Sequence, residues 1–152
     1  MNYWLFKSEP DEFSYEDLTK VKSEPWTGIR NYRARNFLRD EVKKGDLVLF
    51  YHSSCKPTQI VGIAEVVREA YPDPLAFDEN SKYFDPKSNP ENPRWVCVDI
   101  KAKEKLKHPI TLAEAKTEPA LKDMMLTQKM CRLSIQTVTE AEFETILQMG
   151  GN

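Results

Sequence analysis

The chain has 152 residues, of which 40% are hydrophobic, 11% aromatic and 30% charged. This length is typical of one domain with one core, and the composition excludes a disordered or collagen-like chain. No apolar run approaches the ~18 residues that cross a bilayer, and the N-terminus lacks the pattern of a secretion signal. We therefore expect a single domain over residues 1–152, located in the cytoplasm and without a membrane partner.

Charge and cysteine content narrow the function classes further. The net charge of −2 argues against indiscriminate binding to polyanions. Residues 26–71 nevertheless carry eight Lys and Arg against five Asp and Glu, which indicates either a local anion site or only a solvated charged surface. The three cysteines and two histidines show no zinc-ligand spacing. We therefore expect no metal, no cofactor and no disulfide framework.

The first half of the chain predicts two strands and two helices. Residues 3–7 form an apolar, aromatic run that predicts a first strand. Ser14, followed three residues later by Asp17, predicts a capped helix over residues 15–21. Apolar side chains at helical spacing predict a second helix over residues 32–42. Apolar residues on both faces predict a central strand over residues 47–51.

The second half predicts three more strands and a final helix. Alternating side chains predict strands over residues 59–70, 95–100 and 132–138. Gly62 and Ala64 share one face of the first of these strands, where small side chains let another group come close. Thr139 and Glu142 predict a capped helix that ends at Gly150. Residues 72–93, with five of the ten prolines, form a loop that is either functional or only a surface excursion.

Polar and aromatic residues cluster where the predicted strands end. The sequence has none of the motifs of phosphate-binding loops, zinc proteases or serine hydrolases. An aromatic wall with amide and hydroxyl groups suits a nucleobase, because stacking stabilises a bound base by about 1–3 kcal/mol. The alternative is that these aromatics are core or strand-end residues. The clusters cover residues 7–10, 26–32, 51–54 and 132–134.

Five blocks in this order closely resemble the EVE domain family, which includes many small bacterial proteins. The blocks are YWLFKSEP, WTGIRNYRARNFLR, GDLVLFYHSS, IVGIAEVVREAYPDP and RLSIQTV. The resemblance runs from residue 3 to about residue 147. It implies an α+β protein with a PUA-like fold, in which a bent mixed β-barrel of about five to six strands carries flanking helices.

The resemblance also implies a function and a binding pocket. It implies a non-catalytic module that takes a modified base into a pocket, namely methylated or hydroxymethylated cytosine in DNA rather than RNA. We expect this module to be a monomer. Eleven residues carry over by motif position. Lys7 and Ser8 would lie at the pocket edge, and Trp26 would stack on the base beside Asn31 and Tyr32. Arg30 would reach a phosphate. The opposite side would be formed by Tyr51, His52 and Ser53, and the site would be closed by Arg132 and Ser134.

Two other hypotheses stay open at this point. An enzyme acting on a modified nucleoside or nucleic acid could use Lys7, Tyr51 or His52 as a base. A protein-interaction adaptor could use residues 72–93 as its contact. The residues themselves do not decide between DNA and RNA or between cytosine and adenine. The modified-base hypothesis predicts that Trp26→Ala loses binding and leaves the fold intact.

Overall fold

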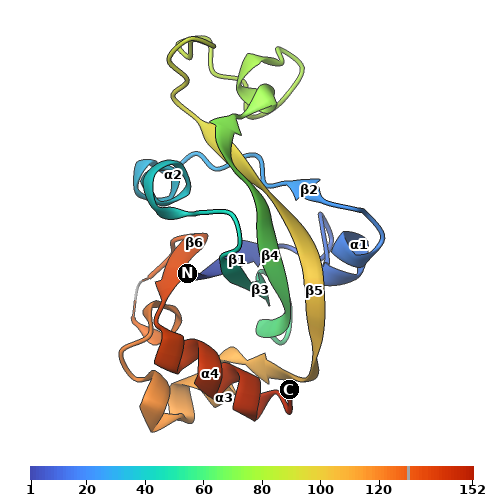
Figure 1. Ribbon diagram of the computed structural model, residues 1–152, viewed down its shortest axis with the longest axis vertical. Coiled ribbons are helices and arrows are strands. Elements are labelled where there is room, and N and C mark those ends of the chain that lie inside the picture. The colour runs from blue at the N-terminus through green and yellow to red at the C-terminus, as the bar shows by residue number, and fades with distance from the viewer. Residues whose placement is uncertain (130) are drawn as a thin grey trace.

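The fold is built on one mixed sheet of six strands in the order β2-β5-β4-β3-β1-β6 (Figure 1). The computed structural model describes residues 1–129 and 131–152. The strands are β1 (Tyr3–Ser8), β2 (Glu24–Pro25), β3 (Leu47–His52), β4 (Gln59–Pro72), β5 (Val96–Thr111) and β6 (Ile135–Val138). The helices are α1 (Tyr15–Thr19), α2 (Tyr32–Asn36), α3 (Leu112–Thr117) and α4 (Glu140–Met149).

Within the sheet, β1 and β3 form a parallel pair, and their carboxyl ends lie at the same end of the sheet. Ser8 lies opposite His52 in this pair, and the backbone nitrogen of Ser53 donates to the carbonyl oxygen of Ser8 at 2.9 Å. The other pairings, β1 with β6, β3 with β4, β4 with β5 and β2 with β5, are antiparallel. Chain segments that leave parallel strands at a common edge can form a ligand site there.

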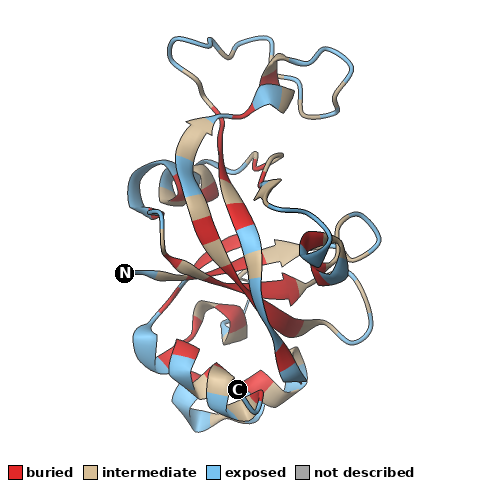
Figure 2. Ribbon diagram, turned by 45° about the vertical axis from the view of Figure 1, so that its right-hand side comes forward, coloured by how far each residue is buried: buried red, intermediate tan, exposed pale blue. Residues whose placement is uncertain are grey.

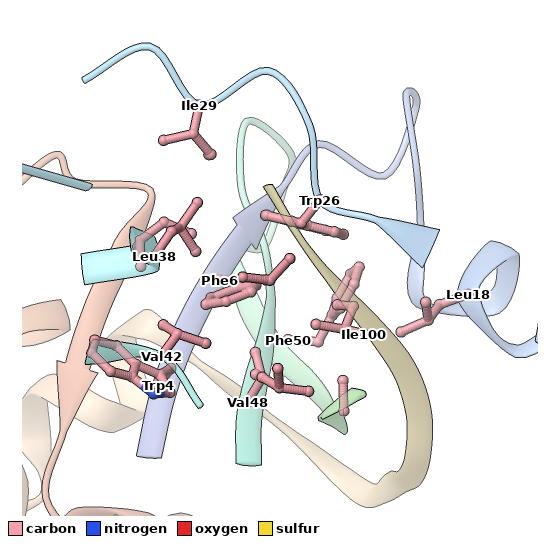
Figure 3. Close-up of a cluster of buried hydrophobic side chains, with 14 of the residues drawn as sticks. Trp4, Phe6, Leu18, Trp26, Ile29, Leu38, Val42, Val48, Phe50 and Ile100 are labelled. Carbon is pink, nitrogen blue, oxygen red and sulfur yellow. The ribbon is translucent and has the colours of Figure 1, made fainter. Parts of the chain in front are cut away.

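Both faces of β1 and β3 are buried, as the apolar runs of these strands predict (Figure 2). Alternate residues face two separate core clusters. Phe6 and Phe50 belong to the first cluster, which α1 and α2 cover (Figure 3). Leu5 and Leu49 belong to the second, which α4 and the segment around α3 cover. The parallel pair is therefore held rigidly from both sides.

The sheet is bent, but it does not close into the expected barrel. Strands β2 and β6 lie at its opposite ends, and no pairing joins them in the described ranges. Register shifts interrupt both ladders of β4, and such bulges bend a strand. The α+β class, the mixed sheet and the flanking helices are confirmed, whereas the sheet stays open.

Gly62 confirms that a small residue in β4 allows a close approach. The group that approaches is the ring of Tyr15, since a Cβ at position 62 would lie 2.5 Å from Tyr15 Cε1. The Tyr15 hydroxyl donates to the carbonyl oxygen of Ile63 at 2.8 Å. This contact docks the first turn of α1 on the sheet, next to the ends of β1 and β3.

The cap signals in the sequence are confirmed, and two helices differ from their predictions. α1 ends at Thr19 instead of residue 21. Ser14 and Thr139 both form capping boxes, with Asp17 and Glu142 respectively. The helix predicted over residues 32–42 consists of α2 followed by a π-helical turn, Phe37–Glu41.

Two strand boundaries were wrong. β5 continues to Thr111 instead of ending at residue 100. Its second half is rich in exposed Lys and Glu, so it shows no apolar alternation, yet it pairs with β4. The C-terminus covers part of its outer edge, where Gly150 accepts from the backbone of His108 at 3.0 Å. β6 begins at Ile135 instead of residue 132.

Candidate functional site

A cavity of about 570 Å³ opens where β1 and β3 end. Its volume lies within the range of small-molecule sites. Its walls come from the ends of β1 and β3, from β2 and the residues after it, from the loop that joins β4 to β5, and from residues before β6. We call that loop, residues 73–95, the excursion loop; it stands at the opposite end of the molecule from α3 and α4 (Figure 1).

The structure brings six of the eleven predicted site residues to this cavity. They come from four separate segments and are Lys7, Ser8, Trp26, Ser53, Arg132 and Ser134. The sequence interpretation missed the remaining lining residues. Five of these lie inside the clusters predicted at strand ends, Tyr83 lies in the loop over residues 72–93, and Phe13 and Glu24 come from segments that carried no signal. The missed residues are Glu9, Glu12, Phe13, Glu24, Pro25, Thr27, Gly28, Ile29, Ser54, Tyr83 and Cys131.

Trp26 is a core residue as well as a lining residue. Its side chain is only 7% exposed, and its ring centroid lies 5.7 Å from that of Phe6 and 5.5 Å from that of Phe50. Its backbone nitrogen donates to the carbonyl oxygen of Val98 at 2.7 Å, which fixes it beside β5. Trp26→Ala would therefore remove core packing as well as a cavity contact, so its effect on binding has to be separated from its effect on stability.

The three tryptophans differ in what their indole nitrogens contact. The Nε1 of Trp4 donates to Asp46 at 2.9 Å, and that of Trp95 donates to Asp85 at 2.8 Å. Trp26 Nε1 has no hydrogen-bond partner among the described residues. Since this nitrogen is not among the fully buried unpaired polar atoms of the described residues, it is accessible as a donor to a ligand in the cavity.

Lys7 and Ser8 form a polar wall held by the backbone. The backbone nitrogen of Lys7 donates to the carbonyl oxygen of Ser134 at 2.9 Å, which fixes the residues before β6 against β1. The Ser8 hydroxyl donates to the carbonyl oxygen of Phe13 at 2.5 Å. Burial lowers the pKa of the Lys7 ammonium, which the nearby Cys131 partly offsets. The wall thus presents a half-buried cation.

Three glutamates also line the cavity. Glu12 lies at the rim and forms an exposed ion pair with Lys82 at 3.5 Å. Burial, with a smaller contribution from the nearby Asp99, raises the pKa of Glu24. The third carboxylate is Glu9. Carboxylates disfavour a phosphate inside the cavity and suit a neutral ring that bears an amine, such as the N4 amine of cytosine.

Tyr51 and His52 do not line the cavity, contrary to the prediction. Tyr51 is 3% exposed and belongs to the second core cluster, and burial raises its pKa. His52 Nε2 accepts a hydrogen bond from the backbone nitrogen of Tyr15 at 3.1 Å. Burial lowers the pKa of His52, in keeping with a neutral imidazole that accepts this bond. Its role in the structure is to anchor α1.

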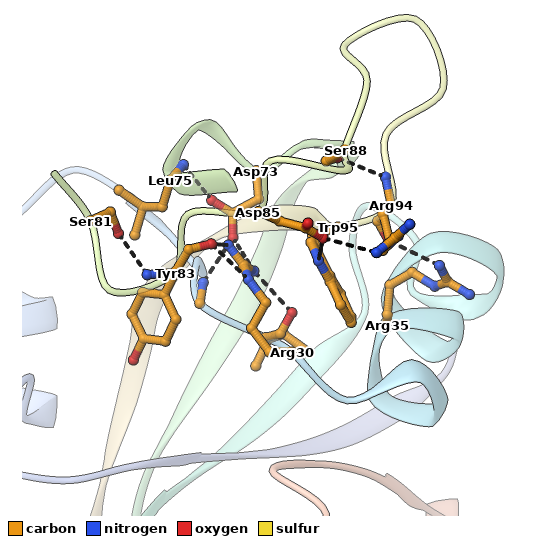
Figure 4. Close-up of polar contacts among 12 residues, drawn as sticks. Arg30, Arg35, Asp73, Leu75, Ser81, Tyr83, Asp85, Ser88, Arg94 and Trp95 are labelled. Carbon is orange, nitrogen blue, oxygen red and sulfur yellow. Dashed lines mark hydrogen bonds and ion pairs between the residues drawn. The ribbon is translucent and has the colours of Figure 1, made fainter. Parts of the chain in front are cut away.

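Arg30, Asn31 and Tyr32 also lie outside the cavity lining. Asn31 Oδ1 accepts from the backbone nitrogen of Ala34 at 3.0 Å, so Asn31 is the N-cap of α2. Tyr32 is 54% exposed and stacks on Trp95 at 4.9 Å between ring centroids. Arg30 forms an ion pair with Asp73 at 2.9 Å (Figure 4). All three side chains have structural partners that the sequence did not indicate.

The excursion loop contributes Tyr83 to the cavity wall. The Tyr83 ring lies against Gly28, where a Cβ would be 2.9 Å from Tyr83 Cζ. Gly28 has a φ of +84°, and its backbone nitrogen donates to Asp73 Oδ2 at 2.8 Å. Position 28 therefore requires glycine both for its backbone conformation and for this close contact.

No helix in the described part of the chain is long and apolar enough to span a membrane. The same part of the chain has no group of three or more Asp, Glu, His and Cys side chains placed to hold a metal ion. What the cavity offers to a ligand is therefore an aromatic floor, hydroxyl groups, carboxylates and the two cations Lys7 and Arg132.

Comparisons with known proteins agree with this fold. The sequence profile of the EVE domain family matches residues 2–149. Human thymocyte nuclear protein 1 is 41% identical over 170 aligned residues, which cover 97% of this chain and 73% of that protein. A structure of the human THYN1 protein in complex with 5-methylcytosine containing DNA is 40% identical, with a TM-score of 0.91 over 100% of this chain and 99% of that one. A crystal structure of a Pseudomonas syringae protein is 44% identical, with a TM-score of 0.92 over 97% of this chain and 99% of that one. The chain therefore belongs to the EVE domain family.

Proposed function

We propose that this chain is a single EVE domain that binds DNA carrying a modified cytosine and takes the modified base into the cavity without converting it. The observation that carries the proposal is the structure of the human relative with 5-methylcytosine DNA, which shares the fold over the whole chain. The cavity supports it, because its volume of about 570 Å³ accommodates a base and its sugar. A cytoplasmic location and a monomeric state stay predictions.

The lining residues match the chemistry of a cytosine ring. Trp26 offers an aromatic surface and a free indole donor, and stacking on it would offset the few kcal/mol that extruding a base costs. The carboxylate of Glu24 suits the N4 amine of cytosine. Lys7 and the hydroxyl group of Ser134 can donate to the ring nitrogen and carbonyl on the same edge, whereas the Ser8 hydroxyl, which donates to Phe13, can only accept.

The test is binding to matched oligonucleotides, measured by fluorescence anisotropy at stated salt. The panel contains single- and double-stranded DNA and RNA with cytosine, 5-methylcytosine, 5-hydroxymethylcytosine or N6-methyladenine. Trp26→Phe keeps a ring in the core but removes the indole donor, so we expect affinity for modified DNA to fall about tenfold.

Trp4→Phe is the matched control, since Trp4 is a buried tryptophan that does not line the cavity. We expect it to bind as tightly as the unmodified protein once thermal melting shows that it is folded. Equal affinity for every oligonucleotide in the panel would contradict the proposal, and so would a loss of binding as large in Trp4→Phe as in Trp26→Phe.

A second candidate function is a hydrolase acting on a modified nucleoside or nucleic acid. It is favoured by the three glutamates at the cavity, since paired carboxylates with one raised pKa carry out acid–base chemistry. Release of product from a modified oligonucleotide, followed by chromatography and abolished in Glu24→Gln, would favour this candidate. No feature of the excursion loop specifically favours the adaptor hypothesis.

A further inference from the structure

Three aromatic rings and two guanidinium groups follow one another in a column beside the cavity, and Figure 4 shows Tyr83, Arg30, Trp95 and Arg35 of this column. The Arg30 guanidinium lies 5.3 Å from the centroid of the Tyr83 ring and 5.4 Å from that of Trp95. Tyr32 stacks on Trp95, and Arg35 lies 4.9 Å from the centroid of the Tyr32 ring. The column thus joins Tyr83, which lines the cavity, to Tyr32, which is exposed on α2.

Arg30 is the group that holds Tyr83 in this column. Its Nε and Nη2 atoms donate to the carbonyl oxygen of Tyr83 at 3.2 and 2.8 Å. Its Nη1 atom donates to Asp73 Oδ2 at 2.9 Å and to the carbonyl oxygen of Ile29 at 3.0 Å. Every nitrogen of the guanidinium therefore donates to a group of the protein, which leaves little of it for a phosphate.

The Tyr83 ring itself has contacts on the protein side and at the rim. It lies against Gly28 on the protein side, and at the rim Lys82 Nζ lies 5.1 Å from its centroid. Lys82 also reaches Glu12 on the other side of the cavity, through an exposed ion pair that contributes little stability. In the described residues no aromatic ring pairs with Tyr83, although Trp26 pairs with three. Tyr83 therefore offers an aromatic surface that no ring of the described residues uses.

We infer that Tyr83 is a ligand-contacting residue of the cavity and that Arg30 is a positioning residue that holds it there. The inference rests on the proposed function, because it assigns a second aromatic contact to the same base. Trp26 then supplies an aromatic surface from the core, and Tyr83 supplies one from the excursion loop. Arg30 affects binding through Tyr83. It also affects the position of Gly28, because its ion-pair partner Asp73 accepts a hydrogen bond from the backbone nitrogen of Gly28.

The first test compares variants at the two ends of the column, using a DNA duplex with one 5-methylcytosine as the probe. We expect Tyr83→Ala to weaken binding by about 5- to 150-fold, as for loss of one stacked base. Tyr83→Phe keeps the ring and should stay within about threefold of the unmodified protein. Tyr32→Ala is the matched control, because it removes an exposed tyrosine of the same column that does not line the cavity.

The outcomes separate this inference from the proposed function. If the unmodified protein shows no preference for the methylated duplex, the proposed function fails. If it shows that preference and Tyr83→Ala binds equally well, only the assignment of Tyr83 fails. Equal losses in Tyr83→Ala and Tyr32→Ala would also overturn the assignment, because the effect would then belong to the column and not to the cavity.

The second test distinguishes positioning from phosphate contact by Arg30. The binding constant falls as the salt concentration rises, and the loss of one phosphate contact makes the slope of log K against log salt less steep by about one. It also weakens binding to all sequences alike. We expect Arg30→Gln to leave that slope unchanged and to reduce the preference for methylated over unmethylated DNA. Arg30→Lys should not restore the preference, since an ammonium cannot replace the planar fork. A slope that is less steep by about one in Arg30→Gln, or full rescue of the preference in Arg30→Lys, would overturn the inference. If Arg30→Gln does not fold, the Tyr83 variants provide the test.

Discussion

Two sides of the cavity are stabilised by different forces. The sheet wall, formed by Lys7, Ser8, Trp26 and Ser53, is an extension of the core, with Trp26 packed among aromatic rings. The loop wall is formed by Tyr83, which depends on hydrogen bonds from Arg30 and on close packing of its ring against Gly28. Apolar burial has no preferred direction, whereas hydrogen bonds require defined distances and angles. Small changes in the shape of the side chains around the cavity should therefore displace the loop wall more than the sheet wall.

The largest effect should come from the sheet wall. Trp26→Ala removes a 7% exposed ring from the first core cluster, and we expect the free energy of unfolding to fall by about 3–5 kcal/mol. Urea denaturation followed by circular dichroism measures this change. Trp26→Phe should cost much less because a ring remains. A loss below about 1 kcal/mol for Trp26→Ala would show that the core does not depend on this ring.

The corresponding change in the loop wall is Asp73→Ala. The Asp73 side chain is fully buried and accepts from Arg30, from the Gly28 backbone and from the Leu75 backbone. Its removal leaves the two backbone donors unpaired and takes the only ion-pair partner in the described residues from a largely buried guanidinium, so we expect a loss of about 3 kcal/mol. Asp40→Ala breaks an exposed aspartate–arginine pair and serves as the control; equal effects of the two variants would contradict the dependence of the loop wall on Asp73.

A smaller effect on stability is expected for two glycine substitutions, and only the one that contacts the loop wall should also change DNA binding. Gly28 and Gly45 both have a positive φ, of +84° and +94°, but a Cβ at position 28 meets Tyr83 whereas one at position 45 meets nothing within 4 Å. We expect Gly28→Ala and Gly45→Ala each to lose about 1–2 kcal/mol from backbone strain. Only Gly28→Ala should also weaken binding of methylated DNA. Equal binding by both would show that the position of Tyr83 does not matter.

The same division explains how much of the site the sequence predicted. Lys7, Ser8, Trp26 and Ser53 lie at the ends of apolar elements or beside Gly28, and local patterns reveal such positions. Tyr83 lies within an irregular loop, and its place depends on contacts with Gly28 and Arg30, more than fifty residues away in the chain. No local pattern encodes such a contact.

Some residues that were predicted to line the cavity lie elsewhere for a related reason. Arg30 and Tyr32 are in the predicted cluster, but partners from the excursion loop, Asp73 for Arg30 and Trp95 for Tyr32, turn them away from the cavity. The strands and caps were predictable because they depend on residues two to four positions apart. The second half of β5 was not, because its partner strand, and not its own apolar pattern, stabilises it.

The smallest expected effect concerns the support behind the sheet wall and depends on pH. His52 accepts a hydrogen bond from Tyr15, and burial lowers its pKa below the ordinary value of about 6.5. The unfolded chain therefore binds a proton more readily than the folded one, so the stabilisation is full above about pH 6.5 and declines as the pH falls toward the lowered pKa.

Thermal and urea unfolding between pH 7.5 and pH 5 should show this decline in the unmodified protein and a flatter profile in His52→Gln, whose amide oxygen can still accept from Tyr15. We expect the difference to stay below about 1 kcal/mol. If the free energy of unfolding depended on pH in the same way in both proteins, the contribution of His52 to this decline would be contradicted. Because His52 does not line the cavity, His52→Gln should bind methylated DNA normally. A loss of binding at neutral pH in a folded His52→Gln would show that the sheet wall is less rigid than its core packing implies, and that the position of α1 also shapes the cavity.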